Sequence, residues 1–206
     1  IRDTLYMTLA STLFGYIIGL PMGIVLTVTD KDGIRPNAAV YKVLDVISNL
    51  LRSIPFIILL IVLIPFTRFV VGRSYGSTAT IVPLTIAAAP YIARMVESSL
   101  KEVDAGVIEA ARSMGASDFQ IVTKVMLVEA RTSLIVGATI SLGTILGYSA
   151  MAGTVGGGGL GDIAIRYGYT RWQTDIMVVT VVLLVILFQI FQTIGMKIAN
   201  RLDRRK

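Results

Sequence analysis

Five stretches of this chain contain no Asp, Glu, Lys or Arg, and most are long enough to cross a lipid bilayer. They are residues 4–29, 53–67, 74–93, 132–161 and 176–196. A helix needs roughly 20 apolar residues to cross the hydrocarbon core of a bilayer. In the whole chain 54% of the residues are hydrophobic and 16% are charged, against about 25% charged in an ordinary soluble domain. The sequence therefore predicts an all-α membrane protein and argues against a soluble enzyme.

Two of the five stretches have the wrong length for a single crossing. The second is short, but Val40, Val43, Leu44 and Ile47 recur at helical spacing upstream of it, which predicts one long second helix. The fourth is too long, and its glycine-rich tail favours a loop. We therefore expect one transmembrane domain over 1–206 with five transmembrane helices. The expected spans are 4–29, 43–67, 76–96, 132–152 and 176–197, with a cytoplasmic loop over 98–131 and an outer glycine-rich loop over 153–172.

The distribution of basic residues predicts how the chain is oriented. Of the 19 Lys and Arg residues, 14 fall within 28–52, 94–131 and 197–206, which lie on one side if there are five spans. Cytoplasmic loops of membrane proteins carry an excess of Lys and Arg. We therefore expect the N-terminus outside and the C-terminus in the cytoplasm.

Small residues repeat along the first span. Gly15, Gly19 and Gly23 are spaced four residues apart. Such residues let membrane helices approach closely, so helix packing is the favoured interpretation. A surface that slides during a transport cycle is the alternative.

Several chemistries are excluded by what the sequence lacks. It contains no cysteine and no histidine, which removes disulfides, thiol nucleophiles, Ser-His-Asp triads and most zinc sites. No phosphate-binding G-x-x-x-x-G-K-[ST] loop is present, so any ATP hydrolysis belongs to another chain. No span has an ionisable residue near its middle, which weakens a proton-coupled mechanism more than a sodium-coupled one.

The glycine run invites two further interpretations. Gly156, Gly158 and Gly161 match G-x-G-x-x-G, but that motif binds nucleotides only between a strand and a helix. Residues 159–162 match the G-x-G-D of intramembrane aspartyl proteases, but those enzymes need a facing aspartate, and Asp175 lies in the same outer region. A flexible outer loop is the simplest prediction.

The loop between the third and fourth spans reads as two short helices with a turn between them. Asp104 is placed to cap the first, and Gly115 suits the position just after its end. Ser117 and Gln120 have the spacing of a capping box at the start of the second. The physics alone leaves two possibilities open, an amphipathic connector at the membrane surface and a protruding knob that docks on a partner.

The residues of this loop resemble the EAA loop of ABC importer permeases. The shared pattern is Glu109-Ala110-Ala111, three residues, Gly115, and nine residues to Val125 and Leu127. This chain departs from the pattern at Val125, where the family has isoleucine, and at Val128, where it has proline. Without that proline we expect the helix to continue where the family usually bends.

The resemblance extends over nearly the whole chain and becomes more specific after the fourth span. Residues 147–153, the glycine run 156–161, residues 162–169 and residues 173–175 resemble the permease subunits of bacterial methionine importers, which are type I ABC importer permeases. The five-span layout with the N-terminus outside is similar too.

The resemblance implies a homodimer in the bacterial inner membrane, with a translocation pathway for methionine at the two-fold axis. Two cytoplasmic ATPase subunits would bind ATP and Mg²⁺, and an extracytoplasmic substrate-binding lipoprotein would deliver the solute. The surrounding lipid is the remaining partner; no nucleic acid, metal or cofactor is expected on this chain. A permease for another amino acid or small solute stays open as an alternative. A channel or scaffold that works without ATP also stays open.

The same resemblance implies roles for particular residues. Glu109 would anchor the loop through a charge-assisted hydrogen bond to a basic side chain or a backbone N–H. Met151, beside Tyr148 and Ser149, is a candidate apolar gate at the dimer axis, with a lipid-facing or core methionine as the alternative. The residues expected to couple the chain to the ATPase are Asp104, Val107, Ile108, Glu109, Ala110, Ala111, Arg112, Met114, Gly115, Ala116 and Ser117. Those expected to face the binding protein are Gly156, Gly157, Gly158, Gly159, Gly161, Asp162 and Arg166.

Overall fold

The structure is a computed structural model that describes residues 1–202, and these residues form a bundle of helices without a β-strand. Four helices are long and apolar enough to cross a membrane. They are α1 (Arg2–Thr29), α5 (Ser77–Lys101), α9 (Arg131–Ala152) and α11 (Thr174–Leu202). The all-helical fold class is confirmed, and these helices coincide with four of the five predicted ranges. Arg204, Arg205 and Lys206, which contribute to the predicted orientation, lie outside the described residues.

The second predicted span is not one helix, and this expectation was wrong. Its residues form α2 (Ala38–Ser53) and α3 (Phe56–Val62), whose axes are bent by 102°. Ile54 is extended (φ −81°, ψ 124°) because the proline that follows it disfavours the helical conformation. Pro55 also lacks the N–H that would continue the helix. A further short helix, α4 (Ile64–Val71), completes this corner of the molecule.

The core of the bundle is the contact between α1 and α5. A Cβ on Gly19 would lie 2.6 Å from the Ala89 carbonyl oxygen, and one on Gly23 would lie 2.7 Å from the Val96 Cβ. No larger residue fits at these positions without moving α5. The glycine spacing is therefore used for close helix packing, as favoured above.

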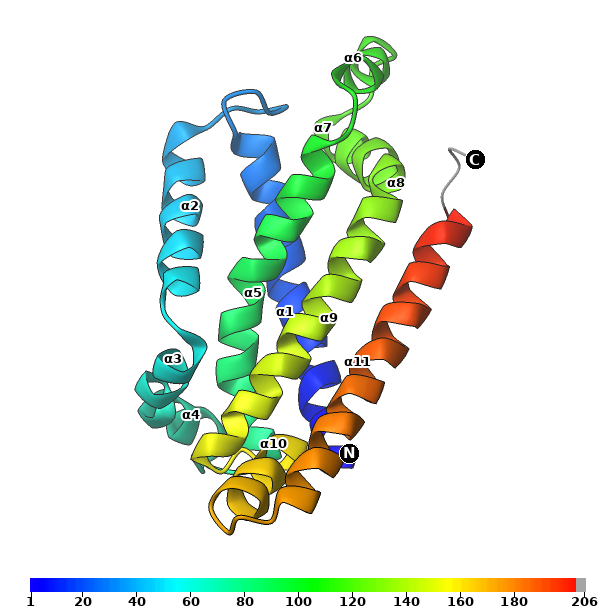
Figure 1. The fold of residues 1–206 in the computed structure, drawn as a ribbon. Helices are drawn as coiled ribbons and strands as arrows, with labels where there is room; N and C mark the ends of the chain where they lie inside the picture. Colours follow the sequence, from blue (N-terminus) through cyan, green and yellow to red (C-terminus); the bar gives the residue numbers. More distant parts are fainter. Residues whose placement is uncertain (203–206) are drawn as a thin grey trace.

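The segment between α5 and α9 projects beyond one end of the bundle (Figure 1). It contains α6 (Ala105–Ser113), α7 (Asp118–Gln120), a π-helical stretch η1 (Ile121–Met126) and α8 (Leu127–Glu129). Two short helical arms joined by a turn were predicted, and both are present. The helix continues through Val128, as expected without proline, and breaks at Ala130 just before α9.

The glycine-rich segment at the opposite end was expected to be a loop, but helical turns make up most of it on either side of Gly156 and Gly158, which have φ of +79° and +83°. It forms a 3₁₀ turn η2 (Gly153–Val155), α10 (Gly159–Ile163) and a π-helical stretch η3 (Ala164–Tyr169). Helix α9 rather than a strand precedes this glycine run, so the strand that a nucleotide-binding G-x-G-x-x-G requires is not there, in agreement with the argument from the sequence.

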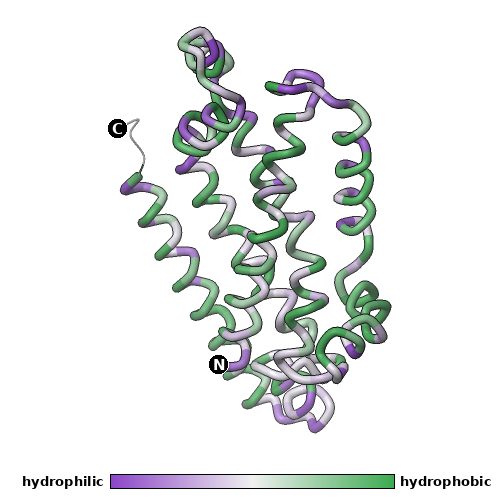
Figure 2. Tube along the Cα trace, turned by 180° about the vertical axis from the view of Figure 1, so that it is seen from behind, coloured by the Kyte–Doolittle hydropathy of each residue, from purple (hydrophilic) through white to green (hydrophobic). Residues whose placement is uncertain are grey.

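The two ends of the bundle differ from its middle in polarity. Figure 2 shows hydrophobic residues along the helices and hydrophilic residues gathered at the projecting segment and at the glycine-rich end. The N-terminus and the C-terminal end of α11 lie at opposite ends of the bundle (Figure 1). That arrangement agrees with an odd number of crossings.

Candidate functional site

The first arm of the projecting segment, α6, is closed at both ends by its own backbone and side chains. The Gly106 N–H donates to the Asp104 carboxylate at 2.7 Å, so the predicted N-cap is present. At the other end Gly115 has φ +83°, a conformation that suits glycine. Its N–H donates to Arg112 O at 3.0 Å, and the Ala116 N–H donates to Ala111 O at 3.1 Å. These two bonds form a Schellman motif, which fixes the direction in which the chain leaves α6.

The second arm begins at the predicted capping box. The Gln120 N–H donates to Ser117 Oγ at 3.3 Å, and the Ser117 N–H donates to Gln120 Oε1 at 2.9 Å. Both bonds satisfy backbone donors that the helix start leaves free. The turn between the arms is therefore defined by local sequence.

The projecting segment is anchored to α5 by an apolar cluster. Ile121 and Met126 are buried there with Ile92, Val96 and Leu100 of α5. Ala111 attaches α6 to the same cluster. The whole segment therefore stands on the end of α5 as part of one hydrophobic core.

Several large apolar side chains of the projecting segment are uncovered. Met114 is 83% exposed and Phe119 is 76% exposed, and Val107 is exposed as well. Exposed large apolar side chains on a projecting segment mark an interaction surface. The structure thus brings most of the predicted coupling residues onto the projecting segment 105–129, which we call the knob, while Ala111 faces inward.

Glu109 does not make the bond expected of it within this chain. Its side chain is exposed, and among residues 1–202 it has no hydrogen bond or ion pair. It lines a cavity of about 430 Å³ together with Asp30, Lys101 and Arg112. Glu109 is therefore available to a partner that fills this cavity.

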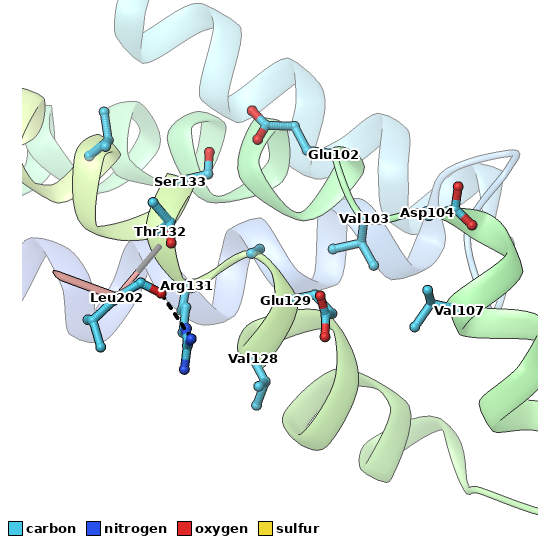
Figure 3. A pocket seen from close by; sticks show the side chains of 12 residues that line it. Glu102, Val103, Asp104, Val107, Val128, Glu129, Arg131, Thr132, Ser133 and Leu202 are labelled. Carbon is cyan, nitrogen blue, oxygen red and sulfur yellow. Dashed lines mark hydrogen bonds between the residues drawn. The ribbon is translucent and has the colours of Figure 1, made fainter. Parts of the chain in front are cut away.

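A second cavity, of about 420 Å³, lies on the other side of the segment's base (Figure 3). Three acidic side chains, Glu102, Asp104 and Glu129, line it. Arg131 donates to the carbonyl oxygen of Leu202 at 2.9 Å, so the end of α11 closes one wall. Together the two cavities flank the attachment of α6 to the bundle.

The candidate gate residues have different environments. Met151 is 49% exposed at the end of α9, and Tyr148 stacks on Phe56 of α3 with ring centroids 4.5 Å apart. Ser149 is buried, and its hydroxyl donates to the Leu146 carbonyl at 2.7 Å. Ser149 therefore does not line an open surface of this single chain, and its place in the gate stays a prediction.

Part of the glycine run packs against the chain itself, and the surface for a binding protein that was expected there stays a prediction. Gly157 and Gly161 are buried, and a Cβ on Gly157 would lie 2.7 Å from Ala152 O. The Leu160 N–H donates to the hydroxyl oxygen of Thr4 at 2.8 Å, tying α10 to the start of α1. Asp162 and Arg166, at the same end of the bundle, form an ion pair with each other at 3.1 Å.

One group of charged residues was not singled out from the sequence. Arg94 and Glu97 lie in α5, with side chains 15% and 6% exposed, and they contact Asp45 of α2 and Lys101. Lys101 also pairs with Asp30 at 2.7 Å, and its hydrogen bond holds the pKa of the Asp30 carboxyl below its ordinary value of 3.8. The spacing of Arg94, Glu97 and Lys101 along one helix face was the available signal.

No group of three or more His, Cys, Asp or Glu side chains within 1–202 is arranged to hold a metal ion.

Comparison with known proteins places this arrangement in a family. Residues 15–206 match the family described as "Binding-protein-dependent transport system inner membrane component". The "Probable D-methionine transport system permease protein MetI" of Vibrio cholerae is 49% identical over 203 residues, covering 98% of this chain and 90% of the relative. The "D-methionine transport system permease protein MetI" of Escherichia coli K12 is 56% identical over 151 residues, covering 73% of this chain and 70% of the relative.

Solved structures share the fold. A chain from "Inward facing conformations of the MetNI methionine ABC transporter" superposes with a TM-score of 0.97 at 51% identity, covering 99% of this chain and 94% of that one. A chain from the "Crystal structure of an amino acid ABC transporter with histidines" has a TM-score of 0.79 at 20% identity, covering 98% and 91%, and shows the fold alone. The chain described here belongs to the family of inner membrane components of binding-protein-dependent transport systems, and it is a multi-pass inner-membrane protein.

Proposed function

We propose that this chain is the membrane-spanning permease subunit of an ATP-driven methionine importer. The observation that carries the proposal is the projecting knob with its EAA pattern, on a chain similar throughout its length to proteins named as D-methionine permeases. ATP hydrolysis is carried out by a separate ATPase subunit.

The knob supplies the coupling to that ATPase. Its exposed apolar side chains Met114 and Phe119 fit a groove on a cytoplasmic subunit, and Glu109 pairs with a basic side chain or a backbone N–H in that groove. The capped ends and the shared core make the knob rigid, so a movement of the ATPase is transmitted to α5. Two rigid-body arrangements biased by nucleotide are sufficient for transport.

The pathway lies at the two-fold axis of a homodimer. Met151, half-exposed at the end of α9, is placed to form an apolar, deformable gate with the same residue of a second copy. The end of the bundle that carries α10 faces outside, where Asp162 and Arg166 form part of the surface for the substrate-binding protein. The opposite end, with α6, faces the cytoplasm.

The test is methionine uptake and ATP hydrolysis in liposomes that contain this chain, its ATPase and its binding protein. Glu109→Lys and Gly115→Trp abolish uptake while the complex still assembles. Gly72→Trp is the matched control, because Gly72 also has positive φ (+79°) and open space around it but ends α4, away from the knob. Normal uptake in both knob variants contradicts the coupling role. Uptake of another solute instead of methionine would support the assignment as an importer permease and contradict methionine as its substrate.

A further inference from the structure

Helix α2 is attached to the rest of this chain in an unusual way. Among the residues of α2, all of which the structure describes, only Ser48 is buried. Val43 and Leu50 are 59% and 62% exposed, and neither apolar core includes a residue from the first three turns of α2. Apolar packing within the chain therefore does not fix the position of these turns.

Polar contacts to α5 take the place of that packing. The guanidinium of Arg94 contacts the carboxylate of Asp45 and donates to Asn49 Oδ1 at 3.1 Å. Its other terminal nitrogen donates to Glu97 at 2.7 Å. The Tyr41 hydroxyl donates to the same Glu97 carboxylate at 3.3 Å. We call this set of five residues the α2 clasp.

The clasp is partly shielded from water, so it is stronger than a surface ion pair. The side chain of Glu97 is 6% exposed and that of Arg94 is 15% exposed. Lys101 donates a hydrogen bond of 2.8 Å to Glu97 Oε1, the carboxylate oxygen that Arg94 does not contact. Removing one partner leaves a charge without compensation in a low-dielectric site. Since a planar guanidinium presents several donors in fixed directions, Arg94 also sets the angle between the two helices.

Helix α2 is separated from α3 by a bend but is joined by the clasp to the helix that carries the knob. Its C-terminal end leads into the extended residue Ile54 and a 102° bend before α3. By contrast, the helix it is clasped to, α5, shares a core with the projecting knob through Val96 and Leu100. The joint at residues 54–55 separates α2 from α3, while the clasp joins it to the helix that carries the knob.

We infer that Arg94 is a positioning residue for transport, which clasps α2 to α5 so that the two helices move as one body when the knob is displaced. This inference rests on the proposed function, because it assigns the clasp to the step between ATPase movement and the membrane spans. Substrate and nucleotide do not contact Arg94; it acts through the position of α2.

The chain contains no cysteine, so paired spin labels report this movement directly. One label is attached to Val43→Cys on α2 and the other to Ser98→Cys on α5, both exposed positions. The labelled chain is diluted with unlabelled chain and assembled with cysteine-free ATPase and binding protein. The distance between the two labels is measured without nucleotide and with trapped ATP. Each measurement is made on the labelled chain that keeps Arg94 and on the labelled chain with Arg94→Gln.

With the clasp intact, the distance is the same in both nucleotide states. In Arg94→Gln the distribution of label distances becomes broader. The amount of methionine imported per ATP hydrolysed falls about tenfold, which is within the range of typical coupling between sites. The exchange Asp45→Arg with Arg94→Asp restores part of the loss. Asp3→Asn, which removes the exposed Arg2–Asp3 pair at the opposite end, leaves both readouts unchanged. If Arg94→Gln does not fold, Asp45→Asn removes the clasp from the more exposed side.

A distance that changes with nucleotide in the unaltered chain overturns the inference, because α2 then moves apart from α5. The inference is also overturned if both Arg94→Gln and Asp45→Asn keep the narrow distribution of label distances and a normal amount of methionine imported per ATP. If the unaltered complex imports no methionine, the proposed function fails, and the label distances still report whether the helices move together.

Discussion

The side chain of Arg112, on the exposed side of α6, donates a hydrogen bond of 2.9 Å to the backbone carbonyl of Ile34 in the connection between α1 and α2. Arg112 also lies 3.7 Å from Asp118 at the start of the second arm. The side chain of Arg112, which belongs to the first arm, thus contacts the second arm and also a loop that is far away in the sequence. The knob is consequently held to the bundle on a second side, in addition to its core on α5.

Replacing Arg112 by alanine is expected to loosen this second attachment. Hydrogen bonds to charged groups contribute about 1.5–3 kcal/mol, and the lower end applies here because Arg112 is 54% exposed. We expect import per ATP to fall roughly tenfold, which corresponds to about 1.4 kcal/mol. Arg112→Lys, which still presents an N–H donor to Ile34, is the control in the same liposome assay. Equal losses in both variants contradict the role of this bond.

The capping box predicts a local effect at Ser117. Ser117→Ala removes the acceptor of the Gln120 N–H and is expected to cost about 1 kcal/mol of stability in the second arm. Faster hydrogen exchange of the amides of residues 118–121 measures that loss. Ser117→Asp keeps an acceptor and should exchange like the unaltered chain, whereas fast exchange in both variants shows that the box is not what holds the arm.

The contact between α1 and α5 predicts a steric effect at Gly23. A Cβ there would lie 2.5 Å from Ala93 O and 2.7 Å from Val96 Cβ, so Gly23→Ala forces the helices apart. Overpacking of this kind costs about 1–3 kcal/mol, and the melting temperature of the purified chain should fall accordingly. Gly137→Ala in α9 is the matched control, because its nearest neighbour, Met95 Cβ, would be at an ordinary 3.5 Å. Because alanine is the better helix former, helix propensity alone would raise the melting temperature of both variants. A similar fall in both variants would therefore show that the close contact at Gly23 is not the cause.

The ion pair of Asp30 with Lys101 predicts an acid-dependent effect. Because the hydrogen bond from Lys101 lowers the pKa of Asp30, the carboxylate stabilises the folded chain at pH values above 3.8. That contribution is lost as the pH falls through the lowered folded-state pKa. Asp30→Asn should therefore have a lower melting temperature than the unaltered chain at neutral pH. The two curves should approach each other as the pH is lowered below 3.8, and a constant difference contradicts the assignment.

Much of the knob could be predicted from the sequence because its geometry is local. Asp104, Gly115, Ser117 and Gln120 act on backbone groups within a few residues of themselves, so their types and spacing are sufficient. The apolar stretches predicted the long helices for a similar reason, since a bilayer imposes a length and a composition on each crossing. The bend at Ile54 had a sequence signal in Pro55, but the apolar periodicity on both sides of it favoured a continuous helix.

The sequence by itself determined that this chain is an all-helical membrane protein with a capped helical knob of the EAA type, because these properties depend on local spacing and on the total of apolar residues. Only the tertiary structure decided that Gly157 and Gly161 pack against the end of α9, where the sequence had indicated a loop. It likewise decided that Asp45 meets Arg94, since residues 49 positions apart are brought together by how α2 folds back along α5. Contacts of that kind depend on the relative placement of helices, and no spacing along one segment encodes it.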